Sequence, residues 1–181
     1  FSVKLDKLDL FDNIESNNKQ CFILAADGMP KITEGRGSFL KDATMLGIKF
    51  LSKKNKPFFM MSEGSQIDWG GHDNDVNYLI TELIDFDEMI GAVLDYAERD
   101  GETLVIVTSD HETGGFTLSG KKYIQENDYS IDYNDIDPVF STSGHSATLI
   151  PVFAYGPGSE EFRGIYDNTD IFNKILKVTN W

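Results

Sequence analysis

The stretch that decides the fold is DFDEMIGAVLDYAERDGETLVIVTSDHETGG, residues 85–115. In its first part, over residues 85–100, apolar side chains recur at helical spacing. They are Phe86, Met89, Ile90, Val93, Leu94 and Ala97. Asp85 with Glu88 fits a capping box, and Gly101 follows the last turn. These signals predict a helix over residues 85–100.

After this helix the chain enters a short apolar run without polar alternation, which is typical of a strand covered on both faces. Four such runs occur along the chain, at residues 20–25, 57–62, 103–109 and 149–155. Residues 38–52 and 169–178 have the spacing of amphipathic helices. Alternating strands and helices predict the α/β class, with a mostly parallel central sheet flanked by helices.

Composition favours one folded domain over residues 1–181, because 40% hydrophobic and 12% aromatic residues suffice for a core. The net charge of −14 argues against a nucleic-acid partner, whose phosphates need clustered Lys and Arg. No apolar stretch approaches the roughly 20 residues of a membrane span, and no signal peptide opens the chain.

Cys21 lies alone in an apolar run, so we expect a buried thiol. Residues 119–143 are polar and predict a surface excursion.

All three histidines stand beside carboxylates or glycine turns, which indicates a metal site. Asp68 and His72 are one helical turn apart and therefore project from one face. Asp110 and His111 follow a predicted strand directly, at the carboxyl end where α/β sheets place their chemistry. His145 precedes its strand instead and must arrive from a loop.

Clustered His and Asp side chains suit zinc, whereas Glu63, which follows the 57–62 run, suits magnesium. A pair of zinc ions about 3.5–4 Å apart can clamp a phosphoryl transfer. Each residue also has a simpler interpretation when taken alone. Asp68 with His72 fits an ordinary helix start, and Asp110 with His111 fits a cap of the next turn. Glu63 fits a surface carboxylate, and His145 fits a plain loop.

Three blocks together resemble the C-terminal half of the alkaline phosphatases. They are FFMMSEGSQIDWGGHDND and its continuation to DHETGGF (residues 58–116), STSGHSATLIPVFAYGPG (141–158) and DNTDIFNKIL (167–176). Weaker similarity extends upstream through ILAADGMP. The resemblance implies an alkaline-phosphatase-like fold of which this chain is a partial domain.

The resemblance also implies ligands, cofactors and a reaction. It assigns Asp68, His72 and His145 to a first zinc, Asp110 and His111 to a second zinc, and Glu63 to a magnesium. In the family a serine attacks a phosphate monoester, the first zinc stabilises the leaving alkoxide, and the second lowers the pKa of the serine. A zinc-bound water then cleaves the phosphoserine.

The family's nucleophile lies in an Asp-Ser-Ala motif that does not occur in this sequence. The bridging Asp and the phosphate-binding Arg precede or follow that serine in the family, and none of the three arginines here lies in a comparable segment. We therefore expect the chain alone to be inactive.

Asp27, in a DGM segment, looks like the family's first metal aspartate but lies too near the EGxxID block to take that role. Trp69 is expected to face the phosphate pocket, and Thr113 replaces a histidine that supports the ligands in some members, which alters how the aspartate is oriented.

Two hypotheses follow from the sequence. In the first, the chain is the C-terminal part of a periplasmic or extracellular phosphomonoesterase that forms a homodimer as a full-length protein, as the resemblance implies. In the second, it is a stand-alone metal-binding or interaction domain of the same superfamily without catalysis.

Overall fold

The computed structural model describes residues 2–4, 22–24, 30–126 and 128–181. Cys21 and Asp27, for which the sequence makes predictions, lie outside the described residues.

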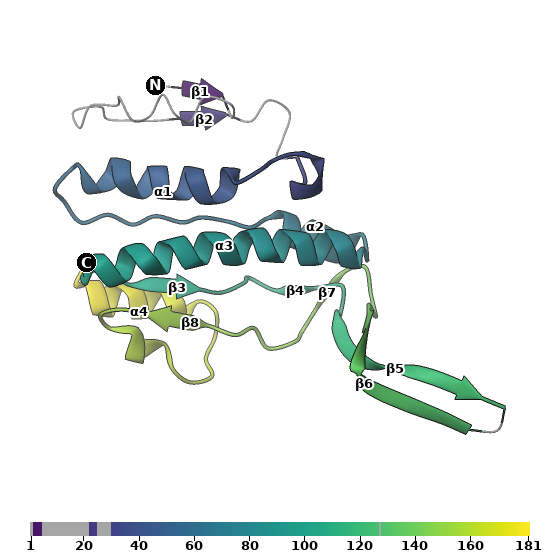
Figure 1. Ribbon diagram of the computed structural model, residues 1–181. Coiled ribbons are helices and arrows are strands. Elements are labelled where there is room, and N and C mark those ends of the chain that lie inside the picture. The colour runs from purple at the N-terminus through teal and green to yellow at the C-terminus, as the bar shows by residue number, and fades with distance from the viewer. Residues whose placement is uncertain (1, 5–21, 25–29, 127) are drawn as a thin grey trace.

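Four α-helices form the described frame (Figure 1). They are α1 (Phe39–Ser52), α2 (Gln66–His72), α3 (Val76–Asp100) and α4 (Asp170–Thr179), with short 3-10 helices η2 (Ile32–Glu34) and η3 (Ser159–Phe162). The predicted bounds of α1 and α4 hold to within one residue at each end. None of the described helices combines the length and the apolar composition that crossing a bilayer requires.

The prediction that a helix begins at Asp85 is wrong, because α3 begins nine residues earlier at Val76. Its N-cap is Asp75, whose carboxylate accepts a hydrogen bond from the backbone N of Tyr78 at 3.0 Å. Asp85 lies inside the helix, where it is buried rather than capping a terminus. The C-terminal prediction is confirmed, since Gly101 ends α3 in the left-handed conformation with φ 73°.

The strands form four two-stranded sheets among the described residues. Strand β1 (Ser2–Lys4) pairs in parallel with β2 (Phe22–Leu24). The other pairs are antiparallel: β3 (Val105–Val107) with β8 (Phe153–Tyr155), β4 (Glu112–Thr113) with β7 (His145–Ser146), and β5 (Thr117–Gln125) with β6 (Asp128–Val139). The α/β class is confirmed, but a mostly parallel central sheet is not formed by these residues, and residues 57–62 run extended without strand pairing.

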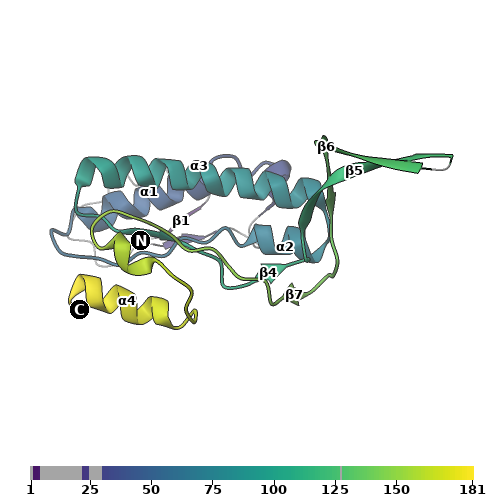
Figure 2. The ribbon, with the colours of Figure 1, turned by 90° about the horizontal axis from the view of Figure 1, so that it is seen from below.

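Helices cover both sides of the β3–β8 pair. Helices α1 and α3 pack against each other on one side, and α4 lies on the other (Figure 2). The buried apolar side chains of the described core are Ile48, Tyr78, Leu79, Met89, Ala97 and Phe162. Most of them belong to α3, so this helix is the centre around which the other elements pack.

A buried cluster of charges fastens the segment before α1 to α3. The guanidinium of Arg36 donates hydrogen bonds to the carboxylates of Glu82 and Asp85, the latter at 2.8 Å. Glu82 also accepts from the backbone N of Ile32 at 2.8 Å, and Arg36 donates to the carbonyl of Pro30 at 3.0 Å. Burial of the guanidinium lowers its pKa, but these carboxylates outweigh that effect and raise the pKa of Arg36 above its usual value.

The β5–β6 hairpin projects away from the helices (Figures 1 and 2). Its side chains are largely exposed, including Leu118, Ile124 and Tyr133. On the hairpin itself, Asp135 pairs with Lys121 at 3.2 Å and accepts from the hydroxyl of Tyr123 at 2.5 Å.

Candidate metal centre

Helix α2 presents two of the predicted ligands from one face. Asp68 and His72 are four residues apart, and Oδ2 of Asp68 lies 3.5 Å from Nε2 of His72. The helix can approach its neighbours closely because two of its last three residues are glycines. A Cβ on Gly70 would lie 2.7 Å from the backbone of Leu79 in α3, and one on Gly71 would lie 2.8 Å from the carbonyl oxygen of Thr113 in β4. Glycine is therefore required where α2 contacts α3 and β4.

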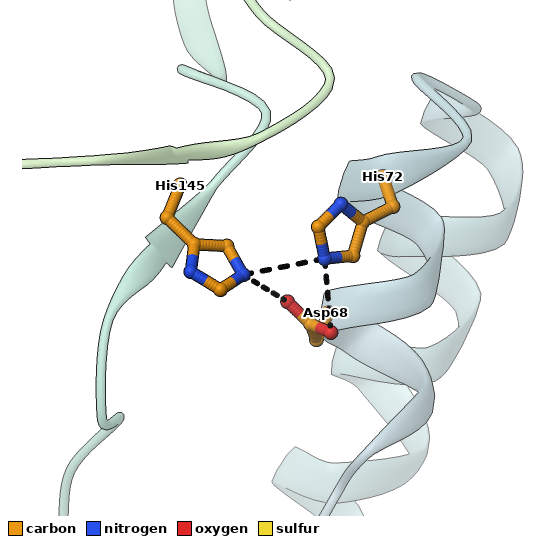
Figure 3. Close-up of side chains that lie close together, drawn as sticks. All are labelled: Asp68, His72 and His145. Atoms are coloured by element: carbon orange, nitrogen blue, oxygen red, sulfur yellow. Dashed lines mark hydrogen bonds and ion pairs between the residues drawn. The ribbon is translucent and has the colours of Figure 1, made fainter.

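His145 reaches the same place from β7 (Figure 3). Its Nε2 lies 3.3 Å from Nε2 of His72 and 4.0 Å from Oδ1 of Asp68. One ligand atom from each of Asp68, His72 and His145 lies within 4.8 Å of the other two. Two imidazole nitrogens and a carboxylate oxygen are a donor set that zinc accepts, so these residues fit a divalent cation.

The position of His72 directs its Nε2 toward Asp68 and His145. Its Nδ1 lies 2.7 Å from the backbone carbonyl oxygen of Ser143. A carbonyl only accepts, so Nδ1–H donates to it, and in the neutral tautomer that makes this bond the lone pair of Nε2 points toward Asp68 and His145. The sequence did not point to Ser143, because every residue has a backbone carbonyl and the residue type does not show which of them binds a histidine.

Asp110 and His111 lie next to this group. Nε2 of His111 is 3.2 Å from Oδ2 of Asp110, so one cation can contact both side chains. The His111 ring stacks on that of His145, with centroids 3.5 Å apart and planes inclined by 19°. The pair thus adjoins the Asp68 group, since Nδ1 of His111 also lies 4.0 Å from Oδ1 of Asp68.

Thr113 connects the two groups. Its hydroxyl donates to Oδ1 of Asp68 at 2.5 Å and lies 3.1 Å from Nδ1 of His111. Since the hydroxyl proton goes to the carboxylate, Nδ1–H of His111 donates to the threonine oxygen, and in the neutral tautomer that makes this bond Nε2 presents its lone pair toward Asp110. One side chain therefore orients a predicted ligand in each group.

Replacing Thr113 by valine keeps the volume and removes both hydrogen bonds. We expect zinc affinity to fall by about 10–100-fold, the usual effect of losing a group that orients a ligand. Competition with a chromophoric chelator measures this affinity. Thr117→Val, at an exposed position in β5, is the matched control, and equal affinities in the two variants would contradict the orienting role.

The loop before His145 closes on Gly114, which directly follows β4. The backbone N of Gly114 donates to the carbonyl of Gly144 at 2.9 Å, and the backbone N atoms of Ser141 and Thr142 donate to the carbonyl of Gly114 at 3.0 and 3.1 Å. Gly114 has φ 92°, which disfavours a side chain at this point. These contacts bring His145 opposite Thr113, its partner in the β4–β7 register.

The two remaining predicted residues are exposed near α2. Glu63 lies at the end of the extended 57–62 segment, just before the start of α2, and is not part of the Asp68 group. Trp69 follows Asp68 in α2 with 61% of its surface exposed. Both side chains are open to a ligand or to further protein.

Comparison with known proteins shows the family of the chain. The family model for alkaline phosphatase matches residues 5–136. Alkaline phosphatase 3 of Bacillus subtilis (strain 168) is 30% identical over 96% of this chain and 52% of its own length. Alkaline phosphatase of Escherichia coli (strain K12) is 30% identical over 74% of this chain and 30% of its own.

Solved structures extend the similarity to the fold. The alkaline phosphatase from the Antarctic bacterium TAB5 is 64% identical, with a TM-score of 0.87 over 94% of this chain and 49% of its own. A mutant of the TAB5 enzyme has Mg bound in its M3 site and gives a TM-score of 0.88. The chain spans about half the length of alkaline phosphatase 3 and of the TAB5 enzyme. By sequence and by fold, it belongs to the alkaline phosphatase family.

Proposed function

We propose that this chain supplies the metal-holding part of a phosphate monoester hydrolase. The observation that carries the proposal is the convergence of Asp68, His72 and His145, whose ligand atoms lie within 4.8 Å of one another, in a chain of the alkaline phosphatase family. These three residues would hold one zinc ion. Asp110 and His111 would hold a second, because their side chains approach to 3.2 Å beside the first group.

Glu63 is proposed as a ligand of one magnesium ion. Magnesium prefers carboxylate oxygens and retains water, which suits a single exposed carboxylate before α2. The Mg bound in the M3 site of the TAB5 mutant supports magnesium as a family cofactor.

When bound, two such cations stabilise the attacking and leaving oxygens of an in-line phosphoryl transfer. The chain's own residues prepare the site for them. Asp68 and Asp110 supply negative charge, Ser143 and Thr113 hold the imidazoles of His72 and His111 in the ligating tautomer, and Trp69 would form a wall of the phosphate pocket.

The nucleophilic serine, the bridging aspartate and the phosphate-binding arginine would come from the part of the fold that the longer relatives possess. Hydrolysis would therefore require that part, and the 181 residues alone would bind cations without turning over substrate. A homodimer and a periplasmic or extracellular location are further proposals made by analogy with the family.

Zinc stoichiometry tests the ligand assignment. We expect about two zinc ions per wild-type chain and one in His72→Ala, because water replaces an imidazole poorly at a zinc site. The measurement is metal analysis after dialysis against a fixed free zinc concentration. Asp95→Ala, on the exposed side of α3, controls for general effects of substitution, and unchanged stoichiometry in His72→Ala would sink the assignment.

Hydrolysis of p-nitrophenyl phosphate tests the activity in the same preparations. We expect none from the chain alone and measurable turnover after mixing with the portion of the TAB5 enzyme that this chain does not match. Turnover by the isolated chain would refute the proposal that the nucleophile and the phosphate-binding arginine come from another part of the fold. Zinc binding without turnover in the mixture would instead favour a non-catalytic metal-binding domain.

A further inference from the structure

Asn74 occupies the turn between α2 and α3 in a conformation that few residues adopt. Its φ is 51°, in the left-handed region where asparagine is among the few tolerated side chains. Its backbone N donates to the carbonyl of Gly71 at 3.1 Å, which terminates α2 directly after His72. The turn therefore fixes the direction of the Asn74 side chain.

The amide of Asn74 faces two carbonyl oxygens from different segments. One terminal atom of the amide lies 2.8 Å from the carbonyl oxygen of Thr142 and 2.9 Å from that of Gly71, and which of the two amide atoms it is follows from these neighbours. An amide oxygen at this position would face two acceptors, so the nitrogen occupies it and donates both of its hydrogens. One side chain thus joins the end of α2 to the loop that precedes His145.

Two consecutive carbonyls of this loop are held by two residues at the end of α2. Asn74 holds Thr142, and His72 holds Ser143 through Nδ1 at 2.7 Å. The backbone–backbone hydrogen bonds of the loop run to Gly114, next to β4, so the bonds from Asn74 and His72 are the described ones that tie the loop directly to the end of α2.

We propose that Asn74 is a positioning residue that holds the 141–144 loop against the end of α2. It thereby sets the 3.3 Å separation of the His72 and His145 nitrogens before a cation arrives. The inference rests on the proposed cation site for its functional consequence, but its structural part applies to the metal-free chain as well. Pre-setting the two imidazoles reduces the conformational entropy lost when a cation binds.

Two substitutions distinguish the effect of the Asn74 side-chain amide from the effect of its backbone conformation. Asn74→Gly keeps the positive φ and removes the amide, whereas Asn74→Asp keeps the size and loses both donors. Asn55→Gly is the matched control, because Asn55 also has a positive φ, 56°, but follows α1. The effect of an added glycine on the unfolded chain is shared by both glycine variants and cancels between them.

Hydrogen exchange in the metal-free chain is the first readout. We expect the backbone amides of Thr142 and Gly144 to exchange several-fold faster in Asn74→Gly and Asn74→Asp than in Asn55→Gly. Unchanged exchange at these amides would overturn the proposal, whatever the chain binds.

Zinc affinity by chelator competition is the second readout. We expect a loss of about tenfold or more in both Asn74 variants and none in Asn55→Gly. Affinity equal to that of Asn55→Gly would also overturn the positioning role. If the wild-type chain binds no zinc, the proposed function fails instead, and the exchange experiment still decides whether Asn74 holds the loop.

Discussion

Replacing Arg36 by methionine is expected to lower the free energy of unfolding by about 3–5 kcal/mol, the usual cost of removing one partner from a buried ion pair. The side chains of Arg36, Glu82 and Asp85 are only 3%, 3% and 6% exposed. Methionine has a similar length but no charge, so two carboxylates remain buried without a cation. Urea denaturation followed by circular dichroism measures the change.

Arg163→Met is the matched control, because Arg163 is exposed after η3. We expect it to change the free energy of unfolding by less than about 0.5 kcal/mol. The Arg36 variant should also accelerate hydrogen exchange at Ile32, whose backbone N donates to Glu82. Equal stability of the two variants would show that the cluster contributes little to the fold.

Gly70→Ala is expected to destabilise the chain by about 1–3 kcal/mol, the range for overpacking a close contact. The added Cβ would lie 2.7 Å from both N and Cα of Leu79, and a backbone cannot move aside as a flexible side chain can. Helix α2 must shift away from α3 and carry Asp68 and His72 with it. We therefore expect weaker zinc binding together with the lower stability, measured by chelator competition and urea denaturation.

Gly91→Ala provides the comparison within α3. A Cβ at Gly91 meets nothing within 4 Å, so alanine should stabilise the helix by about 0.5–1 kcal/mol through its higher helix propensity. A lower free energy of unfolding in Gly70→Ala and a higher one in Gly91→Ala would identify the contact between α2 and α3, rather than the loss of a glycine, as the cause of the destabilisation. An unchanged free energy of unfolding in Gly70→Ala would contradict the close contact between α2 and α3.

Features that depend on neighbours in the sequence were predictable. Helices α1 and α4 follow from local apolar periodicity, and their bounds match the expectation closely. The one-turn spacing of Asp68 and His72 likewise placed both side chains on one face of α2, where Nε2 and Oδ2 lie 3.5 Å apart.

Features that depend on distant partners were not predictable. Asp85 fits a local capping pattern, yet its carboxylate binds Arg36, 49 residues away, and the helix continues through it. Apolar runs show that a strand is buried but not the direction of its neighbour, so the antiparallel β3–β8 pair was missed. The approach of His145 to His72 depends on backbone carbonyls and glycine turns, which leave weak signals in residue type.

The β5–β6 hairpin departs and returns beside a single glycine. The backbone N of Ser141 donates to the carbonyl of Gly114 at 3.0 Å. This hydrogen bond joins the two ends of the hairpin, its root, before the chain reaches His145. Lengthening, trimming or exchanging the arm beyond that root should leave His111 and His145 in register. We therefore expect the arm to accept a grafted recognition sequence without a change in the positions of the two histidines.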